Sequence, residues 1–338
     1  MHLLEKFILS AQKNPKKIVL PEGTDERILS ATNIIIENNI AEIILLGDSK
    51  TILQKAKNLH LQNIIKAEIL NPETDLKREK YADLMVEIRK EKGLTKNEAL
   101  KLLNDPLYFM VMMVKTRDAD GGCGGAASPT ANVIRPALQI IRTKPGIKTV
   151  SGAFIMITPD QNYGENGVFI FADCAVCPYP TEEQLAEIAI TSADTAKNIA
   201  GIDPKIAMLG FSTKGTVEHE MCNRIIKAMK IAKTRNPNLQ IDGELQADTA
   251  IVETVAKRKA PESLIAGKAN VLIFPTLETG NIAYKLVQYL GNTKAIGPIL
   301  QGLNAPINDM SRGCSTDDII HIVAVTAFQA KSNYTPTL

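Results

Sequence analysis

The residues best suited to chemistry lie together in the segment Asn308-Asp-Met-Ser-Arg-Gly-Cys-Ser-Thr-Asp-Asp318. Ser315, with Asp318 three residues later, has the pattern of a capping box at the start of a helix. Just before that start, Ser311 and Arg312 place a hydroxyl and a guanidinium beside exposed helix N–H groups, which suits the binding of an anion. The segment therefore predicts a helix start, an anion site, or both at once.

Two further arginines are candidates for binding an anion. Arg135 precedes Pro136, and because the residue before a proline avoids the helical region, we expect a break there and a new helical turn at Pro136. At such a break Arg135 either points toward an anion or stays on a helix surface as an exposed charge. Arg89 stands in the run Met-Val-Glu-Ile-Arg-Lys-Glu-Lys, which by itself is typical of a solvated face.

Two glycine-bearing segments are candidates for phosphate contacts. Residues 118–130 read DADGGCGGAASPT and predict a flexible loop, which neither follows a clear strand nor matches a dinucleotide-binding fingerprint. The segment Gly210-Phe-Ser-Thr-Lys-Gly215 follows an expected strand and precedes an expected helix, so Ser212 and Lys214 can meet a phosphate there. A plain turn between strand and helix explains the second segment equally well.

Metal, redox and serine-hydrolase chemistry find little support in the sequence. Cys174 and Cys177 have the spacing of a zinc or redox pair, but no second pair follows and the four histidines are scattered. No histidine is placed for a Ser-His-Asp arrangement, so base catalysis must come from a carboxylate. We therefore expect no metal and no bound cofactor. The five cysteines fit free thiols in a reducing cytoplasm.

The composition is that of an ordinary globular protein. The chain has 338 residues, of which 45% are hydrophobic and 22% charged, so it can bury a core without disulfides. Its 39 basic and 37 acidic residues leave a net charge of +2, which argues against nucleic acid as a partner. The N-terminus is a poor signal peptide, and no apolar run approaches the roughly 20 residues that span a bilayer. We expect a cytoplasmic protein without membrane contact.

Hydrophobic periodicity predicts the scaffold that must position these residues. Short buried runs alternate with amphipathic segments, the pattern of sheets whose strands are joined by helices. The expected strands are 17–21, 42–46, 149–157, 168–172, 206–209, 271–274 and 295–300; the expected helices are 24–38, 75–90, 95–103, 106–116, one through 141, 181–199, 217–234, 279–290 and 316–331. All of these strands in one sheet would make it very wide. We therefore expect an α/β fold of two lobes with a cleft between them, and ligands bound at the strand ends.

Six segments resemble the phosphate acetyltransferase family, in order and over essentially the whole chain. They are Val19-Leu-Pro-Glu-Gly-Thr-Asp-Glu-Arg27, Ala127-Ser-Pro-Thr-Ala-Asn-Val-Ile-Arg135, Phe171-Ala-Asp-Cys-Ala-Val176, Ser212-Thr-Lys-Gly215, Asp242-Gly-Glu-Leu-Gln-Ala-Asp248 and Asn308-Asp-Met-Ser-Arg-Gly-Cys-Ser315. The family interconverts acetyl-CoA plus phosphate with acetyl phosphate plus CoA. The resemblance thus implies an acyltransferase with coenzyme A as a substrate.

The resemblance also implies a division into domains. Members of the family have two α/β lobes related to the isocitrate and isopropylmalate dehydrogenases, with the active site in the cleft, and homodimers are usual. By this similarity, residues 1–146 and 297–338 form the first domain and residues 147–296 the second.

The resemblance matches single residues of this sequence to the family's site residues. Asp318 matches the base that takes the CoA thiol proton, Ser311 the hydroxyl that helps the tetrahedral intermediate, and Arg312 the arginine that neutralises charge at the reacting phosphate or carbonyl. The residues expected to bind substrate are Arg135, Arg89, Ser128, Thr130, Ser212 and Lys214. For Arg89 this reverses the solvated-face interpretation.

Ordinary pKa values set a condition on the implied mechanism, a direct transfer in a ternary complex. A thiol pKa of about 8.5 and an aspartate pKa of about 3.9 differ by about 4.6 units, which opposes proton transfer by roughly 6 kcal/mol. Asp318 therefore needs burial that raises its pKa, a thiolate stabilised by Arg312 and the helix N-terminus, or transfer concerted with attack on the carbonyl.

Other functions stay open at this point. A phosphate butyryltransferase would keep the same residues and enlarge the acyl pocket. A non-catalytic acetyl-CoA-binding regulatory module, like the related part of some large malic enzymes, would bind the ligand without turnover. A nicotinamide dehydrogenase is disfavoured because the glycine-rich segment lacks the expected context.

Overall fold

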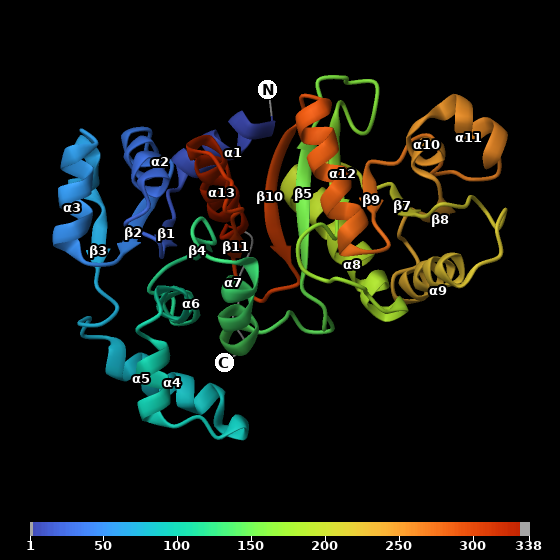
Figure 1. Cartoon of the computed structure of the whole chain (residues 1–338). Helices are drawn as coiled ribbons and strands as arrows, with labels where there is room; N and C mark the ends of the chain where they lie inside the picture. The colour runs from blue at the N-terminus through green and yellow to red at the C-terminus, as the bar shows by residue number, and fades with distance from the viewer. Residues whose placement is uncertain (1–2, 332–338) are drawn as a thin grey trace. The chain divides into compact units, whose positions relative to one another are not determined.

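The computed structural model describes residues 3–331, which form two compact units (Figure 1). The first unit is drawn from Met1–Thr143 and Leu303–Leu338, and the second is Lys144–Gly302. Each unit contains one sheet with helices packed on it, so the α/β fold class expected from the sequence is confirmed. Residues 1–2 and 332–338 of the first expected domain lie outside the described residues.

The first unit is built on a parallel sheet. In order of pairing its strands are β11 (Ile307–Asp309), β4 (Gly121–Gly124), β1 (Lys17–Leu20), β2 (Glu42–Leu46) and β3 (Glu68–Leu70). Its helices are α1 (Leu3–Lys13), α2 (Glu26–Glu37), α3 (Ser49–Asn58), α4 (Arg78–Ile88), α5 (Lys96–Leu102), α6 (Pro106–Lys115), α7 (Thr130–Pro136) and α13 (Thr316–Gln329), with short helical turns at Gln62–Lys66 and Lys90–Lys92. Because the strands are parallel, their carboxyl ends share one edge, where α/β sheets bind ligands.

The segment predicted to be a flexible loop contains a buried strand instead. Gly121–Gly124 forms β4, which pairs with β1 on one side and β11 on the other. A side chain on Gly121 would lie 2.7 Å from Thr326 of α13, and one on Gly122 would lie 2.7 Å from Met110 of α6. The prediction was wrong because the helices packed on the two faces leave no room for a side chain at Gly121 or Gly122, so glycine here marks close packing rather than a flexible loop.

The second unit contains a mixed sheet. In order of pairing its strands are β10 (Lys294–Gln301), β5 (Ser151–Ile157), β6 (Val168–Ala172), β9 (Val271–Ile273), β7 (Ile206–Leu209) and β8 (Ile241–Leu245). β5 is antiparallel to both of its neighbours, and the remaining pairs are parallel. Its helices are α8 (Glu182–Thr195), α9 (Glu220–Arg235), α10 (Ala247–Ile251), α11 (Glu253–Lys259) and α12 (Leu277–Leu290). α12 crosses one face of β10, β5 and β6, and its Tyr284 stacks on Phe154 of β5 with ring centroids 4.0 Å apart (Figure 1).

Local capping signals place α8 as the sequence predicts. Thr181 accepts a hydrogen bond from the backbone N–H of Gln184, and the Gln184 side chain bonds back to Thr181. After α8 the helix continues through a wider turn at Ala196–Ala200 and ends at Gly201, whose φ of 70° is left-handed. The predicted N-cap and the terminating glycine are confirmed.

The break predicted at Arg135 does not occur. α7 runs from Thr130 to Pro136, with the proline inside the helix, and continues as a π-helical turn over Ala137–Ile141. The wider turn begins directly after Pro136, where the ring and the missing N–H disfavour regular α-helical bonding. Arg135 therefore lies on the exposed side of a continuous helix, and the prediction of a new helix start was wrong.

Two further features bear on the sequence predictions. Cys123, Cys174, Cys177, Cys222 and Cys314 are all free thiols. Within residues 3–331, no helix combines the length and the apolar composition that crossing a bilayer requires.

Candidate active site

The segment that follows β11 forms a turn and then the first turn of α13. The predicted capping box is present: Asp318 Oδ2 accepts from the Ser315 N–H at 2.9 Å and from the Ser315 hydroxyl at 2.8 Å, and Ser315 Oγ accepts from the Asp318 N–H at 3.2 Å. Among the described residues, none donates a hydrogen bond to the second oxygen of the half-buried Asp318. One oxygen caps the helix while the other is left for a proton, so the capping and catalytic interpretations are compatible.

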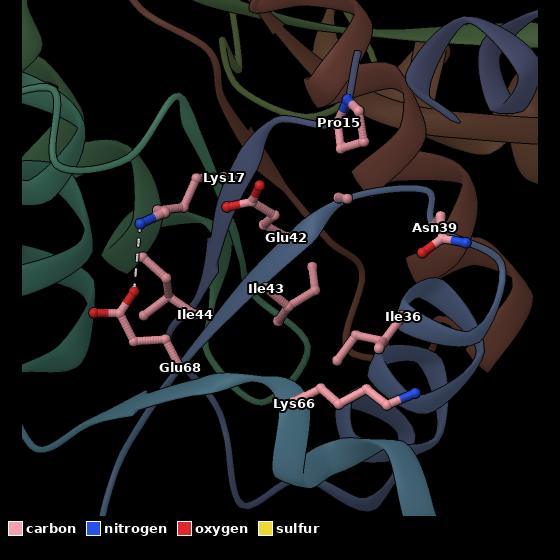
Figure 2. A pocket seen from close by; sticks show the side chains of 10 residues that line it. Pro15, Lys17, Ile36, Asn39, Glu42, Ile43, Ile44, Lys66 and Glu68 are labelled. Carbon is pink, nitrogen blue, oxygen red and sulfur yellow. Dashed lines mark ion pairs between the residues drawn. The ribbon is translucent and has the colours of Figure 1, made fainter. Parts of the chain in front are cut away.

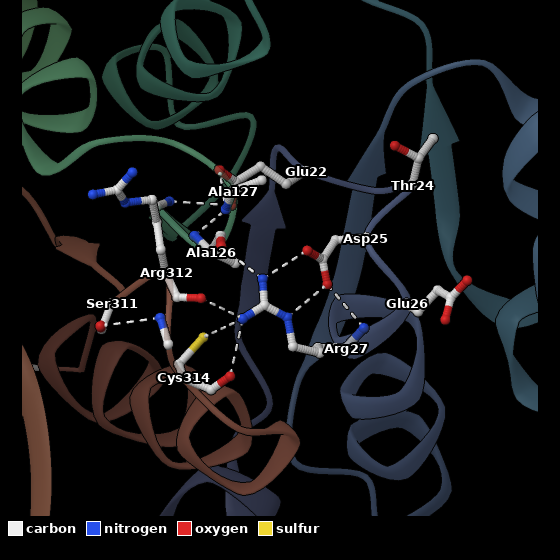
Figure 3. Close-up of polar contacts among 12 residues, drawn as sticks. Glu22, Thr24, Asp25, Glu26, Arg27, Ala126, Ala127, Ser311, Arg312 and Cys314 are labelled. Atoms are coloured by element: carbon white, nitrogen blue, oxygen red, sulfur yellow. Dashed lines mark hydrogen bonds and ion pairs between the residues drawn. The ribbon is translucent and has the colours of Figure 1, made fainter.

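Ser311 and Arg312 are exposed in the turn before α13. Ser311 Oγ accepts a hydrogen bond from the Gly313 N–H at 3.2 Å, which leaves its hydroxyl proton free to donate. Figure 3 shows the Arg312 guanidinium directed away from the contacts around Arg27. Since no ion pair involves Arg312 in the described part of the chain, its charge is available for an anion.

Arg27, at the start of α2, holds this turn in place (Figure 3). Its Nη1 donates to the carbonyl oxygens of Arg312 at 2.7 Å and Cys314 at 3.1 Å, and its Nη2 donates to the carbonyl of Ala126 at 2.6 Å. Asp25 pairs with the same guanidinium at 2.8 Å, and the Arg27 hydrogen bond lowers the pKa of Asp25. Sequence reasoning gave Arg27 no role, although its place just after β1 was an available signal.

The Glu22 carboxylate accepts hydrogen bonds from the backbone N–H groups of the loop after β4. It accepts from Gly125 at 3.1 Å, Ala126 at 2.7 Å and Ala127 at 2.9 Å. The sequence suggested these N–H groups as possible phosphate contacts. In the structure they already donate to the Glu22 side chain. Ser128 follows in the same loop and is half-buried.

Asp309, the last residue of β11, is fully buried at the same edge of the sheet. Its Oδ2 accepts the Thr130 hydroxyl at 2.6 Å, whereas its Oδ1 has no hydrogen-bond partner. Burial is the main cause that raises the pKa of Asp309 to about 7, and the negative charge of Glu22 raises it further. Sequence reasoning did not single out Asp309; the signal was a carboxylate at the carboxyl end of a strand.

Arg89 and Arg135 lie around one buried tyrosine. Arg89 ends α4 and is half-buried, and Arg135 is exposed on α7. The hydroxyl of Tyr108 on α6 donates to Gln139 at 2.9 Å. Burial raises the pKa of Tyr108, and the positive charges of both arginines oppose that rise. The charges of both arginines therefore act on the Tyr108 hydroxyl, and both stay candidates for binding an anion.

Ser212 and Lys214 lie in the second unit, in the loop after β7. Lys214 Nζ pairs with Asp242 at 2.7 Å. Ser212 is buried, lies 3.1 Å from the Thr216 hydroxyl and accepts from the Val217 N–H at 3.1 Å. Ser212 thus has partners in its own loop, Lys214 has one on β8, and their role toward substrate stays a prediction.

A pocket of about 380 Å³ lies elsewhere in the first unit (Figure 2). Its lining consists of Pro15, Lys17, Ile36, Asn39, Ala41, Glu42, Ile43, Ile44, Lys66 and Glu68. Lys17 and Glu42 begin β1 and β2, so the pocket lies at the amino ends of the strands, opposite the edge that carries Glu22 and Asp309. The size of this pocket therefore does not identify the reactive edge.

The first unit thus gathers a hydroxyl, a guanidinium and carboxylates at the carboxyl edge of a parallel sheet, an arrangement typical of α/β enzymes that act on anionic substrates. Residues 2–327 match the family model described as phosphate acetyl/butaryl transferase, and the chain belongs to that family. The family resemblance drawn from the six segments is thereby confirmed. Within residues 3–331, no group of three or more His, Cys, Asp or Glu side chains is arranged to hold a metal ion.

Individual relatives agree with this assignment. A phosphate acetyltransferase from Clostridium acetobutylicum is 51% identical, over 98% of this chain and 99% of its own. One from Bacillus subtilis is 48% identical, over 93% and 94%. Among solved structures, a phosphotransacetylase from Streptococcus pyogenes has a TM-score of 0.90 at 44% identity and covers 98% of each chain. The EutD phosphotransacetylase from Staphylococcus aureus has a TM-score of 0.86 at 44% identity, over 97% of this chain and 98% of its own.

Proposed function

We propose that this chain reversibly transfers an acetyl group between coenzyme A and inorganic phosphate, converting acetyl-CoA and phosphate into CoA and acetyl phosphate. The observation that carries the proposal is the turn from Ser311 to Asp318. It offers a hydroxyl donor, a guanidinium with no ion-pair partner among the described residues, and a carboxylate with one oxygen outside the capping box. Relatives of nearly the same length that are named phosphate acetyltransferase support the acetyl assignment.

The proposed reaction is a direct transfer. A phosphate oxygen attacks the thioester carbonyl as its proton passes to Asp318, and the tetrahedral intermediate forms. The C–S bond then breaks while Asp318 gives that proton to the sulfur. In the reverse direction Asp318 accepts the thiol proton as the sulfur attacks acetyl phosphate. Arg312 and the Ser311 hydroxyl stabilise the charge on the intermediate. No covalent enzyme intermediate, metal or cofactor is needed, because positioning and charge stabilisation account for the catalysis.

The geometry favours two ways of overcoming the thiol–carboxylate mismatch of roughly 6 kcal/mol. Arg312 and the first turn of α13 both place positive charge where a thiolate would form. A single preorganised donor of this kind is worth about 3 kcal/mol in the transition state. Concerted proton transfer during the attack provides the remainder.

Arg89 and Arg135 are proposed to bind the anionic groups of the substrates. Changing Arg135 to Lys keeps the charge but removes the bidentate geometry, so we expect KM for phosphate or CoA to rise by roughly tenfold or more. Arg89→Ala should have a comparable effect. Steady-state kinetics with each substrate varied measures both, and Lys90→Ala, an exposed neighbour of Arg89, is the matched control. Unchanged KM values would return both arginines to the role of exposed surface charges.

The choice between acetyl and longer acyl groups is tested by comparing substrates. With phosphate present and a chelator added, acetyl-CoA should give a higher kcat/KM than propionyl-CoA, and butyryl-CoA should be the poorest substrate. A preference for butyryl-CoA would make the chain a phosphate butyryltransferase. Binding of acetyl-CoA without any turnover would support a regulatory module instead. The five free thiols support the cytoplasmic location that forms part of this proposal.

A homodimer is also part of the proposal, and α12 offers a surface for it. Ile282, Leu286, Tyr289 and Leu290 are 52%, 52%, 76% and 83% exposed and follow one another on a single face of the helix. A two-fold axis at Leu286 would pair Ile282 of one copy with Leu290 of the other, so the stripe is self-complementary.

Leu286→Glu should therefore convert a dimer into a monomer, because it places two like charges at the centre of the proposed contact. Light scattering on a sizing column measures the mass. Gln288→Glu, which adds the same charge on another side of α12, should remain dimeric. A dimer that survives Leu286→Glu would place the contact elsewhere.

A further inference from the structure

Asp309 is a buried carboxyl group that takes no part in the proposed reaction, although it stands two residues before Ser311. Its side chain is 0% exposed, and a glycine and a threonine confine its two oxygens. A side chain on Gly125 would approach Asp309 Oδ1 to 2.3 Å, and Thr130 Oγ1 lies 2.6 Å from Oδ2. Since Oδ1 has no partner, the hydrogen bond with Thr130 is the main polar contact of this carboxyl group.

The two charge states of Asp309 require opposite hydrogen bonds with Thr130. An ionised carboxylate only accepts, so it holds the hydroxyl proton of Thr130. A neutral carboxyl group can donate from Oδ2 to Thr130 Oγ1, and the proton of Thr130 is then free for another acceptor. A proton on Oδ1 would have no acceptor, which disfavours that position. Thr130 is half-buried, so part of the residue faces solvent.

We propose that Asp309 is a positioning residue that decides whether Thr130 donates its hydroxyl proton to the protein or to the phosphate substrate. The proposal rests on the proposed function, in which Thr130 belongs to the substrate-binding set. It connects three parts of the site: Asp309 ends the strand that leads to Ser311, Thr130 begins the helix that carries Arg135, and Gly125 begins the loop that leads to Ser128.

The surroundings of Asp309 allow both charge states near neutral pH. Burial, together with the charge of Glu22, raises the pKa of Asp309 to about 7. The other titratable groups on the elements packed against β11 are Cys123 of β4, Arg135 of α7, and Asp317, Asp318 and His321 of α13. As the pH rises through about 7, Asp309 becomes ionised and withdraws the Thr130 donor, so affinity for phosphate should fall.

The experiment compares KM for phosphate in wild type, Thr130→Val, Thr130→Ser and Asp309→Asn between pH 6 and pH 8.5. Dividing the KM of one variant by that of another at the same pH removes the effect of the ionisation of phosphate itself. Thr130→Val should raise KM by roughly tenfold at the acid end, the effect of losing a hydrogen bond to a charged group, and by little at the alkaline end. Thr130→Ser keeps the hydroxyl and should restore wild-type behaviour. Asp309→Asn can donate at every pH, so its KM should match wild type at pH 6 and be lower at pH 8.5.

The inference would be overturned if the KM for phosphate of Thr130→Val, divided by that of wild type, stays constant over this pH range. Because that comparison needs only the Thr130 variants, it decides the question even where Asp309→Asn does not fold. Wild-type turnover of acetyl-CoA with phosphate in the same assay reports separately on the proposed function. Normal turnover with a constant ratio would reject the role of Asp309 alone.

Unfolding gives a second readout of the same group. The folded protein keeps the Asp309 proton up to a pKa of about 7. The unfolded chain loses it near the ordinary value of about 3.9. The stability contributed by this proton is therefore complete below about pH 4 and is lost as the pH rises to about 7. Asp309→Asn should gain melting temperature relative to wild type on going from pH 5 to pH 8. If the difference in melting temperature between Asp309→Asn and wild type does not change with pH, the raised pKa of Asp309 would be contradicted.

Discussion

Replacing Asp318 with Asn should lower kcat by roughly 10²–10⁴-fold while the protein stays folded and still binds CoA. Asn keeps the size of the side chain and an oxygen that can accept from Ser315, so the capping box is largely retained. It cannot accept the thiol proton. Loss of a cap alone would cost only about 1 kcal/mol in the free energy of unfolding and little activity. The measurement pairs kcat with CoA as nucleophile and the denaturant midpoint of the same preparation.

The pH dependence of this defect separates a base from a cap. The defect should be largest near neutral pH and should shrink toward a pH of about 8.5, where the CoA thiol ionises in solution. Asp317→Asn is the matched control, because it removes an exposed carboxylate from the same first turn of α13. Near wild-type turnover in a folded Asp318→Asn variant would show that the mechanism is wrong even though the family is right.

Arg312→Ala should lower kcat/KM by about 10²–10³-fold, the usual effect of losing one donor to a developing negative charge. Arg312→Lys should lose roughly tenfold or more, because the charge remains but the fork that binds two oxygens does not. Neither change should destabilise the fold. The turn is held through the backbone carbonyl of Arg312, which accepts from Arg27 and is unaffected by the side chain.

Arg27→Ala provides the contrast. It removes hydrogen bonds to the carbonyls of Arg312, Cys314 and Ala126, so it should shift the denaturant midpoint as well as the activity. Unchanged kcat and phosphate KM in Arg312→Lys would take the Arg312 side chain out of the site. A loss of stability in Arg312→Ala equal to that in Arg27→Ala would show that its role is structural.

Features set by local chemistry could be predicted from the sequence. The capping box of Ser315 and Asp318 depends on residues three apart, and the end of the helix that follows Thr181 depends on one left-handed glycine, Gly201. Most apolar strands were predicted for the same reason, because a buried strand appears in the sequence as a run of consecutive apolar residues. The proposed catalytic set from Ser311 to Asp318 lies in one short segment, so the sequence alone groups these residues.

Features set by distant parts of the chain could not be predicted. The sequence of β4 is typical of a flexible loop. Only the packing of α13 and α6 on its two faces explains why it is a strand. β11 and β8 contain polar residues although they are buried, so a search for apolar runs misses both. Arg27 contacts Arg312 across 285 positions. Asp309 stands out only when its burial and its partner Thr130 are known.

The central claim, direct acetyl transfer between two bound substrates, is tested most directly by isotope exchange. Labelled CoA is incubated with acetyl-CoA and the purified chain, with and without phosphate, and the label that enters acetyl-CoA is measured. Exchange should proceed with phosphate present and be absent without it, because the acetyl group must pass to phosphate before it can return to another CoA. Exchange at the same rate without phosphate would reveal an acetyl group held on the enzyme and would contradict the mechanism proposed for Asp318, Ser311 and Arg312.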